Sequence, residues 1–397
     1  MNTPMASHDG TGQVYTLSAP LPIARPWLGP EEVAAVQRVI ASGWIAQGNE
    51  VAAFERAFAT CVGASHACAV SSCTAALHLA LLGVGVTRGD EVITVSHSFI
   101  ATANAIRYCG ATPVFIDIDP MTYNMDPRLI EAAMSPRTRA ILVVHQMGMP
   151  ADLSSILTLA AHYHVPVIED AACAIGSETS WQGQWQPIGR PHGLVSCFSF
   201  HPRKLMTTGD GGMLTTNDAA LDRQFRQWRQ HGMTIPASLR HGSSQVIYET
   251  YTDVGYNYRM TDLQAAIGIV QLQRLPEIIR QRRALAALYT EALADIRGVT
   301  LPYEPSYAQT NWQSYIVRLD DASRQHSVMQ ALQDRGISTR RGIMCAHLEP
   351  PYASDWPAGC LPHSEAAQRH GLILPLFTGM DENDVVRVVA ALAEILA

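Results

Sequence analysis

Apolar residues recur at helical spacing in the first part of the chain. Val33, Val36 and Ile40 are separated by three or four positions and predict a helix over 30–41. The same spacing predicts a second helix over 50–61. Each helix has one apolar face, which must pack against another part of the protein.

From residue 67 onward, short apolar runs alternate with helical segments. Strands that are apolar along their whole length are typical of a mostly parallel sheet with helices on both faces, and such sheets bind ligands at the carboxyl ends of their strands. We therefore predict an α/β fold. The predicted strands cover 67–70, 91–95, 113–116, 140–144, 165–168, 195–200 and 212–215, and the predicted helices cover 75–82, 100–109 and 153–163.

The pattern changes after residue 257, where helices dominate. A helix over 261–275 is predicted to stop at Pro276, because proline removes a backbone donor, and to resume through 289. The other predicted elements are a strand over 313–319 and helices over 323–335 and 381–396.

The length of 397 residues and this change of pattern indicate two domains. Residues 1–25 mix Gly, Ser, Pro and Thr and predict a loose N-terminal arm. We assign 26–269 to a large domain with the mostly parallel sheet and 270–397 to a smaller α+β domain.

Composition excludes several classes of protein. Apolar residues make up 47% of the chain and charged residues 16%, as in a globular protein. The net charge of -7 and the lack of a basic run give no support for nucleic-acid binding, and no apolar stretch is long enough for a membrane span. Eight cysteines without CxxC or zinc spacing indicate reduced thiols in the cytoplasm, and the N-terminus does not resemble a signal peptide.

One residue type is used a single time. Lys204 is the only lysine, and the other 27 of the 28 Lys and Arg residues are arginine. An ammonium can lose its proton and act as a nucleophile, whereas a guanidinium stays charged. We therefore interpret Lys204 as a functional amine rather than a chance survivor of an arginine bias.

Asp170 follows a predicted buried strand and lies 34 residues before Lys204. Alone, it would most often be a helix cap. Paired with a singular lysine, it suits pyridoxal 5′-phosphate, which needs an amine for its aldehyde and an acid beside its ring nitrogen.

Other candidate positions have plain structural alternatives. The polar turn Ser-Ser-Cys-Thr at 71–74 opens a helix and could bind a phosphate or be an ordinary cap. Phe99 could stack on a ring or belong to the core. The glycines at 209–212 lack the Walker ending and are interpreted as a tight turn into a strand. His145, Glu169 and His201 have no metal-site spacing, so no metal is expected.

Eight motifs in a fixed order cover the chain from about residue 26 to the C-terminus, and together they resemble the DegT/DnrJ/EryC1/StrS family of pyridoxal-phosphate sugar aminotransferases of fold type I. Their order makes the match far more specific than any single motif. The motifs begin at 42 (SGWIAQG), 71 (SSCTAALHLA), 89 (GDEV), 99 (FIATAN), 167 (VIEDAA), 199 (SFHPRK), 207 (TTGDGG) and 255 (GYNYRM).

The resemblance implies roles for the residues around the ring. Lys204 would form the Schiff base with the cofactor, Asp170 would pair with the pyridine nitrogen, and Phe99 would stack on the ring. Cys173 stands where the family usually has a Gln that donates to the ring hydroxyl. A thiol is a weaker donor, so ring electronics or substrate choice would differ.

The resemblance also implies a phosphate site and a dimer. Cys73, which stands where the family usually has Gly, would offer its backbone N–H, and Thr74 and Ser199 would offer hydroxyl groups. Asn257 would reach the phosphate in the neighbouring subunit, which makes the working unit a homodimer with shared sites.

The implied reaction is an aminotransfer from an amino acid, glutamate or glutamine, to the keto group of a nucleotide-linked sugar or a related ketone of antibiotic biosynthesis. A freed Lys204, with its pKa lowered by the site, would move the proton. Loops 43–48, 240–252 and 340–352 would select the acceptor, with Trp44 and His347 as candidates that could equally be structural. Two alternatives remain, which are elimination or carbon–carbon chemistry on the same scaffold and a non-catalytic regulatory member.

Overall fold

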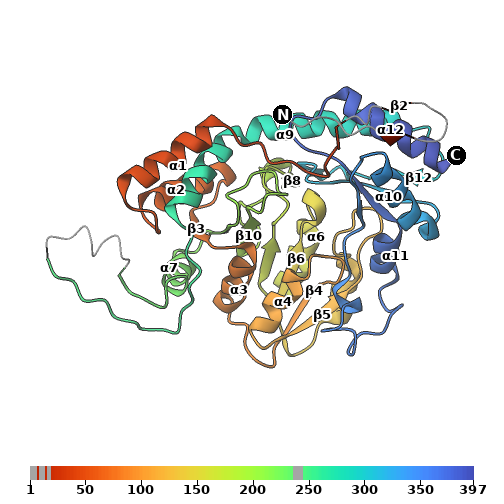
Figure 1. Cartoon of the computed structure of the whole chain (residues 1–397). Coiled ribbons are helices and arrows are strands. Elements are labelled where there is room, and N and C mark those ends of the chain that lie inside the picture. Colours follow the sequence, from red (N-terminus) through yellow and green to blue (C-terminus); the bar gives the residue numbers. More distant parts are fainter. Residues whose placement is uncertain (1–6, 9–13, 16–18, 236–244) are drawn as a thin grey trace.

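A seven-stranded sheet forms the centre of the molecule (Figure 1). The computed structural model describes residues 7–8, 14–15, 19–235 and 245–397. The strand order is β3-β11-β10-β7-β6-β4-β5, and in this sheet β11 runs antiparallel to both neighbours while the other four pairs are parallel. The predicted mostly parallel α/β fold is therefore confirmed. The strands are β3 (His66–Val70), β4 (Glu91–Val95), β5 (Thr112–Ile116), β6 (Thr138–Val144), β7 (Val167–Asp170), β10 (Val195–Ser199) and β11 (Gly212–Thr216).

Helices cover both faces of this sheet. Successive strand residues point to opposite faces, so Val167 packs in the core shared with α2, α6 and α9, while Ile168 packs in the core shared with α3, α4 and α7. The helices are α2 (Asn49–Val62), α6 (Leu153–His162) and α9 (Asp262–Leu293) on one face, and α3 (Cys73–Gly83), α4 (Ala101–Tyr108) and α7 (Ala219–Trp228) on the other.

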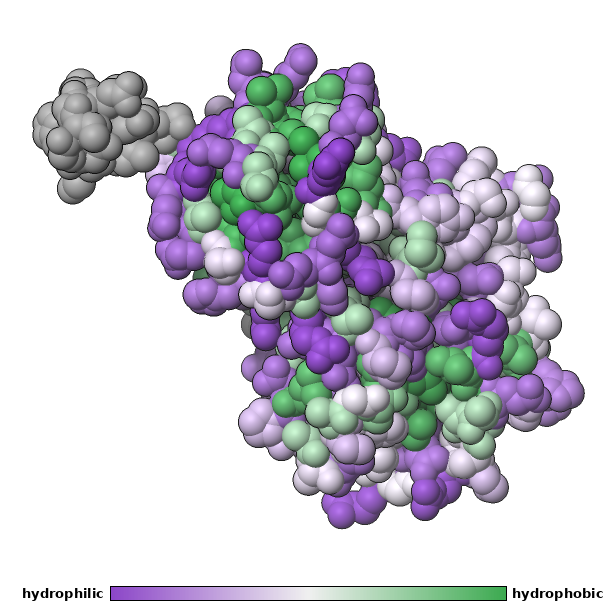
Figure 2. All heavy atoms as spheres, turned by 90° about the vertical axis from the view of Figure 1, so that its right-hand side faces the viewer, coloured by the Kyte–Doolittle hydropathy of each residue, from purple (hydrophilic) through white to green (hydrophobic). Residues whose placement is uncertain are grey.

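A second, four-stranded antiparallel sheet lies in the C-terminal part, in the order β12-β14-β16-β15, and has its own core with α10 and α12. Figure 2 views this side of the molecule, where apolar areas are interspersed among polar side chains. Its elements are β12 (Val299–Thr300), β14 (Tyr315–Leu319), β15 (Arg340–Arg341), β16 (Gly371–Leu374), α10 (Gln325–Asp334), α11 (Pro362–His370) and α12 (Glu382–Leu396).

Helix α9 corrects one prediction. It runs without interruption through Pro276, whereas the sequence predicted a stop there. One half of α9 packs on α1 and α2 and the other half on α12, so burial along its whole length outweighs the proline penalty of about 3 kcal/mol.

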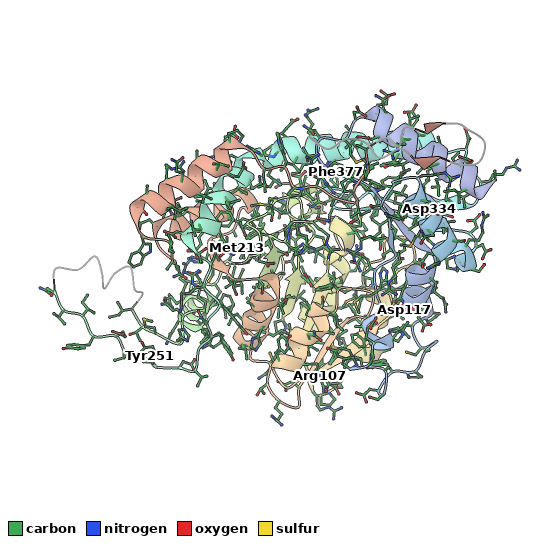
Figure 3. The ribbon with its side chains drawn as sticks, viewed as in Figure 1. Arg107, Asp117, Met213, Tyr251, Asp334 and Phe377 are labelled. Atoms are coloured by element: carbon green, nitrogen blue, oxygen red, sulfur yellow. The ribbon has the colours of Figure 1, made fainter. Side chains whose placement is uncertain are left out.

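Smaller elements connect these units. A three-stranded sheet has the order β13-β8-β9, and it pairs residues 308–309 with strand β8. Leu21 forms an isolated β-bridge with Ile337. Figure 3 shows Met213 inside the body and Tyr251 on a segment that projects from it beyond α7. The remaining elements are β1 (Ser7–His8), β2 (Val14–Tyr15), α1 (Pro30–Ser42), α5 (Ile130–Ala133), β8 (Glu178–Trp181), β9 (Gln184–Pro187) and β13 (Ala308–Gln309).

Within the described ranges, none of the helices combines the length and the apolar character that crossing a membrane requires.

Candidate active site

Asp170 and Ser199 are the last residues of two neighbouring parallel strands, β7 and β10. Two positions earlier on each strand, Ile168 and Cys197 lie in the core beneath α3 and α4. Because side chains alternate along a strand, Asp170 and Ser199 face the same side of the sheet. The two predicted residues are thus brought together at the carboxyl edge of the sheet.

The Asp170 carboxylate is buried and only partly hydrogen-bonded. Thr102 Oγ1 donates to Oδ2 at 2.8 Å, and the Ala172 N–H donates to Oδ1 at 3.2 Å. Burial raises the pKa of Asp170 above its usual value, while these two bonds act in the opposite direction. Thr102 was not singled out from the sequence, although it lies in the motif beginning at Phe99 and in the first turn of α4.

Lys204 lies on the segment between β10 and β11, and its Nζ donates to Cys173 Sγ at 2.9 Å. Burial acts to lower the pKa of Lys204, but Cys173, Cys73 and Asp170 outweigh it, so the pKa lies above its usual value. The expectation of a lowered pKa is therefore wrong for the protein alone, because the folded chain surrounds the amine with groups that favour its charge.

The turn that carries Cys173 is held by a residue far away in sequence. Asn311, which is fully buried, donates from Nδ2 to the backbone oxygens of Cys173 and Ile175, both at 2.8 Å. A Cβ at Gly148 would lie 2.1 Å from Asn311 Oδ1, so this amide needs a glycine beside it. No local pattern in the sequence pointed to Asn311.

The amino end of α3 faces the same edge. Ser72 caps the helix by accepting the Ala75 N–H at 3.1 Å, and Cys73 and Thr74 occupy the first turn, both half-buried. The first N–H groups of a helix have no acceptor within it and attract anions. A Cβ at Gly212 would lie 2.5 Å from the Ser72 carbonyl, so glycine lets β11 approach this turn closely.

Phe99 and Asn257 are both exposed. Phe99 is 65% exposed just before α4, which rules out the core alternative. Asn257 follows the projecting segment, and among the described hydrogen bonds none joins it to Lys204 or Asp170. Its neighbour Tyr258 accepts the Ser71 N–H at 2.8 Å through its backbone oxygen.

His145 and Glu169 form a buried pair on the opposite face of the sheet. Because His145 Nδ1 accepts the Ala151 N–H at 3.1 Å, its proton lies on Nε2 and points to Glu169 Oε2, also at 3.1 Å. Burial acts to raise the pKa of Glu169, but His145 and other donors hold it below its usual value. This satisfied pair supports the strand ends.

The residues and loops expected to select the acceptor differ in their surroundings. His347 is fully buried between Ser96 and Glu365, with its Nδ1 at 2.6 Å from Ser96 Oγ, so it is structural. Trp44 donates from its ring to the Gln47 carbonyl at 3.1 Å. Within loop 240–252, residues 240–244 lie outside the described part of the chain.

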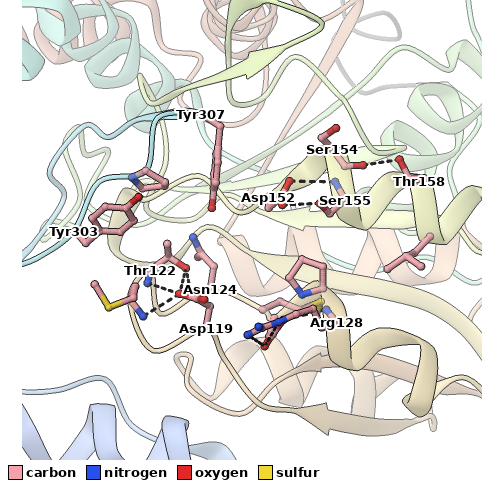
Figure 4. A pocket seen from close by; sticks show the side chains of 16 residues that line it. Asp119, Thr122, Asn124, Arg128, Asp152, Ser154, Ser155, Thr158, Tyr303 and Tyr307 are labelled. Carbon is pink, nitrogen blue, oxygen red and sulfur yellow. Dashed lines mark hydrogen bonds and ion pairs between the residues drawn. The ribbon is translucent and has the colours of Figure 1, made fainter.

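A cavity of about 720 Å³ lies apart from these residues, between segment 119–128, the start of α6 and Tyr303 and Tyr307 (Figure 4). Two carboxylates that line the cavity are hydrogen-bonded within their own turns. Asp119 accepts two backbone N–H groups, and Asp152 accepts the backbone N–H of Ser155. None of the predicted site residues lines it, so we assign it no part of the chemistry.

The residues at the sheet edge fit pyridoxal 5′-phosphate. The chain's only lysine supplies the amine, the buried Asp170 suits a protonated ring nitrogen, and the α3 turn suits a phosphate. The uncovered ring of Phe99 suits a flat ligand. These groups come from four separate segments, and each of them suits a different part of the cofactor.

Comparisons with known proteins agree with the geometry. A model of the DegT/DnrJ/EryC1/StrS aminotransferase family matches residues 26–393. The aminotransferase TlmJ from Streptoalloteichus hindustanus is 35% identical with a TM-score of 0.87, over 95% of this chain and 99% of that one. DesV from S. venezuelae is 34% identical with a TM-score of 0.85, over 95% and 98%.

A third structure is Helicobacter pylori PseC, an aminotransferase involved in the biosynthesis of pseudoaminic acid, which is 25% identical with a TM-score of 0.87, over 95% of this chain and 99% of that one. The family match spans nearly the whole chain, including every motif named above. The chain therefore belongs to the DegT/DnrJ/EryC1/StrS aminotransferase family and is a transaminase that depends on pyridoxal 5′-phosphate.

Proposed function

We propose that this enzyme moves an amino group from glutamate or glutamine to the keto group of a nucleotide-linked sugar or a related biosynthetic ketone. The pseudoaminic-acid role given for PseC and the family match support a sugar acceptor. The observation that carries the proposal is the position of the Lys204 amine, within electrostatic reach of Asp170 at the carboxyl edge of the sheet.

When bound, pyridoxal 5′-phosphate supplies an aldehyde that takes up the amino group and a ring that accepts the electron pair released at the reacting carbon. Lys204 Nζ would hold the aldehyde end and, once free, carry the proton between carbon atoms. The pKa of Lys204 is raised in the protein alone, which favours the protonated amine, and a bound positive charge or further burial would act to lower it.

Asp170 would hold a proton on the ring nitrogen, and Thr102 keeps the carboxylate oriented by donating to Oδ2. The first turn of α3, with Cys73 and Thr74, would bind the phosphate together with Ser199. Phe99 would cover one face of the ring. Each of these roles uses a group that lies at the same edge of the sheet.

A homodimer with shared sites is part of the proposal. The projecting segment carries apolar side chains that one chain leaves uncovered, since Val246, Tyr248 and Val254 are 82–85% exposed. Apolar side chains exposed together on one segment favour an interaction surface there. Asn257 lies at the base of the same segment and would complete the partner's phosphate site.

All eight cysteines are free, which supports the proposed cytoplasmic location. The location has no bearing on the proposed aminotransfer.

The test has two parts. Borohydride treatment of the yellow protein should attach a pyridoxyl group to the peptide that contains Lys204, as seen by mass spectrometry. Incubation with amino donors should convert the cofactor to its amine form, and a panel of keto sugars should then yield aminated products. Attachment elsewhere, or no amine form with any common donor, would refute transamination, and the latter would favour elimination or carbon–carbon chemistry.

A further inference from the structure

The contact between Lys204 and Cys173 joins the chain's only lysine to a thiol. The Nζ–Sγ distance is 2.9 Å, and both residues are only partly buried at the edge of the sheet. Asn311 fixes the backbone of Cys173 from the other side. The sulfur is therefore held against the nitrogen by the fold.

A thiol in such a position is open to oxidation. An ammonium that donates to sulfur stabilises negative charge on it, and the thiolate is the form that reacts with peroxides. The resulting sulfenic acid condenses with a nearby nitrogen to give a sulfenamide. Here the nearest nitrogen is the functional amine itself.

We propose that Cys173 and Lys204 form an oxidation-sensitive pair, which hydrogen peroxide joins through a sulfur–nitrogen bond, thereby inactivating the amine. Cys173 is thus a modification site that reacts with a peroxide. Among the described hydrogen bonds, Lys204 Nζ donates to the sulfur of Cys173 and to no other cysteine, so Cys173 is the thiol placed to form this product.

The reaction balances in two steps. The Cys173 sulfur attacks one peroxide oxygen, the O–O bond breaks, and the released hydroxide takes the proton held between Sγ and Nζ and leaves as water, which frees the neutral Lys204 amine. Lys204 Nζ then attacks the sulfur, the S–O bond breaks, and the hydroxyl leaves as water with a proton from the nitrogen. The sulfur is oxidised by two electrons, the peroxide is reduced to two waters, and an added thiol reverses the bond by attacking the sulfur.

The state of the cofactor controls the reaction, an inference that rests on the proposed function. If Lys204 is bonded to the cofactor aldehyde, its nitrogen is held in a carbon–nitrogen double bond and is not available as the free amine that the sulfenamide needs. When the cofactor holds the amino group, the lysine is free beside Cys173. Oxidation should therefore inactivate the amine form and spare the aldehyde form.

The experiment uses the dimer or monomer as purified, loaded with pyridoxamine 5′-phosphate and treated with hydrogen peroxide. Cleavage at arginine releases peptide 204–223, which carries Lys204 and no cysteine. We expect this peptide linked to the one that carries Cys173, with the loss of two hydrogens, and we expect activity to fall with the linked fraction and to return with dithiothreitol. Because the peptide has no cysteine, the link cannot be a disulfide.

Matched variants decide the assignment. Cys173→Ser should give no link, whereas Cys61→Ser, which removes an exposed thiol, should give as much as the natural chain. Protein loaded with pyridoxal 5′-phosphate should give less. Peptide 204–223 found unlinked while Cys173 is oxidised, or a disulfide between Cys73 and Cys173, would overturn the proposal. Borohydride labelling of Lys204 in the same preparation tests the proposed function separately.

Discussion

Lys204 differs from the 27 arginines both in its chemistry and in its neighbours, since Cys173, Cys73 and Asp170 all favour its charged form. Arginine at this position would keep the charge but could not bond to an aldehyde. We expect Lys204→Arg to lower turnover by at least about 10³-fold, the range of a lost acid–base group. Donor-dependent absorbance changes measure this.

Lys204→Ala is the companion variant, because it removes the charge as well. Thermal unfolding of both variants should stay near that of the natural chain, which separates lost chemistry from lost folding. Turnover that survived in Lys204→Arg would contradict the role of the amine.

Thr102 gives a prediction about pH. Its hydroxyl donates to Asp170 Oδ2 at 2.8 Å and so opposes the effect of burial on that carboxyl. Thr102→Val removes a donor that favours the ionised form, so the pKa of Asp170 should rise further, by about one unit for a bond to a charged group. The acid limb of the pH–rate profile should move to higher pH.

Thr158→Val is the control, because Thr158 donates to the Ser154 carbonyl on the exposed side of α6. Its profile should match that of the natural chain. A Thr102→Val profile that did not move would show that Asp170 does not limit the rate in acid.

At the scale of elements, the site requires strand β11 to approach helix α3 closely. Gly212→Ala would place a Cβ 2.5 Å from the Ser72 carbonyl and 2.6 Å from the Cys73 nitrogen. We expect a loss of about 1–3 kcal/mol of stability from overpacking and faster loss of cofactor, because the first turn of α3 must shift. Dialysis followed by absorbance measures cofactor retention.

Gly209→Ala is the matched control in the same turn. Its Cβ would meet nothing within 4 Å, although its φ of 87° strains a side chain there. Stability should fall by about 1 kcal/mol while cofactor retention stays unchanged. Equal cofactor loss in both variants would show that the α3 contact is not responsible.

At the scale of the whole molecule, Glu55 ties together α2, β3 and α7. It pairs with Arg229 and, at 2.5 Å, with Arg226, and it accepts the Ala69 N–H at 2.9 Å. Burial acts to raise the pKa of Glu55, but the two arginines hold it below its usual value. A lowered pKa contributes stability above the unfolded value, and this contribution is lost as pH falls through the folded value.

Glu55→Gln should therefore lower the free energy of unfolding by about 3 kcal/mol at neutral pH, because Arg229 is left buried without its partner. The difference should shrink as pH falls below the unfolded value and be lost as pH passes through the lowered folded value, where the natural carboxylate also becomes protonated. Denaturant unfolding at several pH values measures this. A constant difference across that range would contradict the linkage.

The proposed dimer can be tested by mixing subunits. Lys204→Ala and Asn257→Ala dimers should each be inactive or weak, but refolding them together should restore activity, because a hybrid dimer contains one site with both residues intact. Activity that did not recover would place Asn257 with its own Lys204 or outside the site.

Element prediction worked where the core imposes a simple period. The strands of the large sheet and the helices predicted over 75–82, 100–109 and 153–163 lie within about two residues of their predicted ends, whereas α5 was not predicted. β8 and β9 were not predicted, because Glu178–Trp181 and Gln184–Pro187 are polar and partly exposed. The stop at Pro276 failed because α9 is buried against both parts of the molecule. The division at residue 270 stays a prediction.

The sequence by itself determined the fold class and the family, and it singled out Lys204 as the proposed reactive amine, because these depend on side-chain type, period and the order of motifs. Only the tertiary structure decided how the groups act on one another. The donation from Thr102 to Asp170, the support of Cys173 by Asn311 and the sulfur placed 2.9 Å from Lys204 join residues 31 to 138 positions apart. Such contacts follow from strand order and packing, which local pattern does not encode.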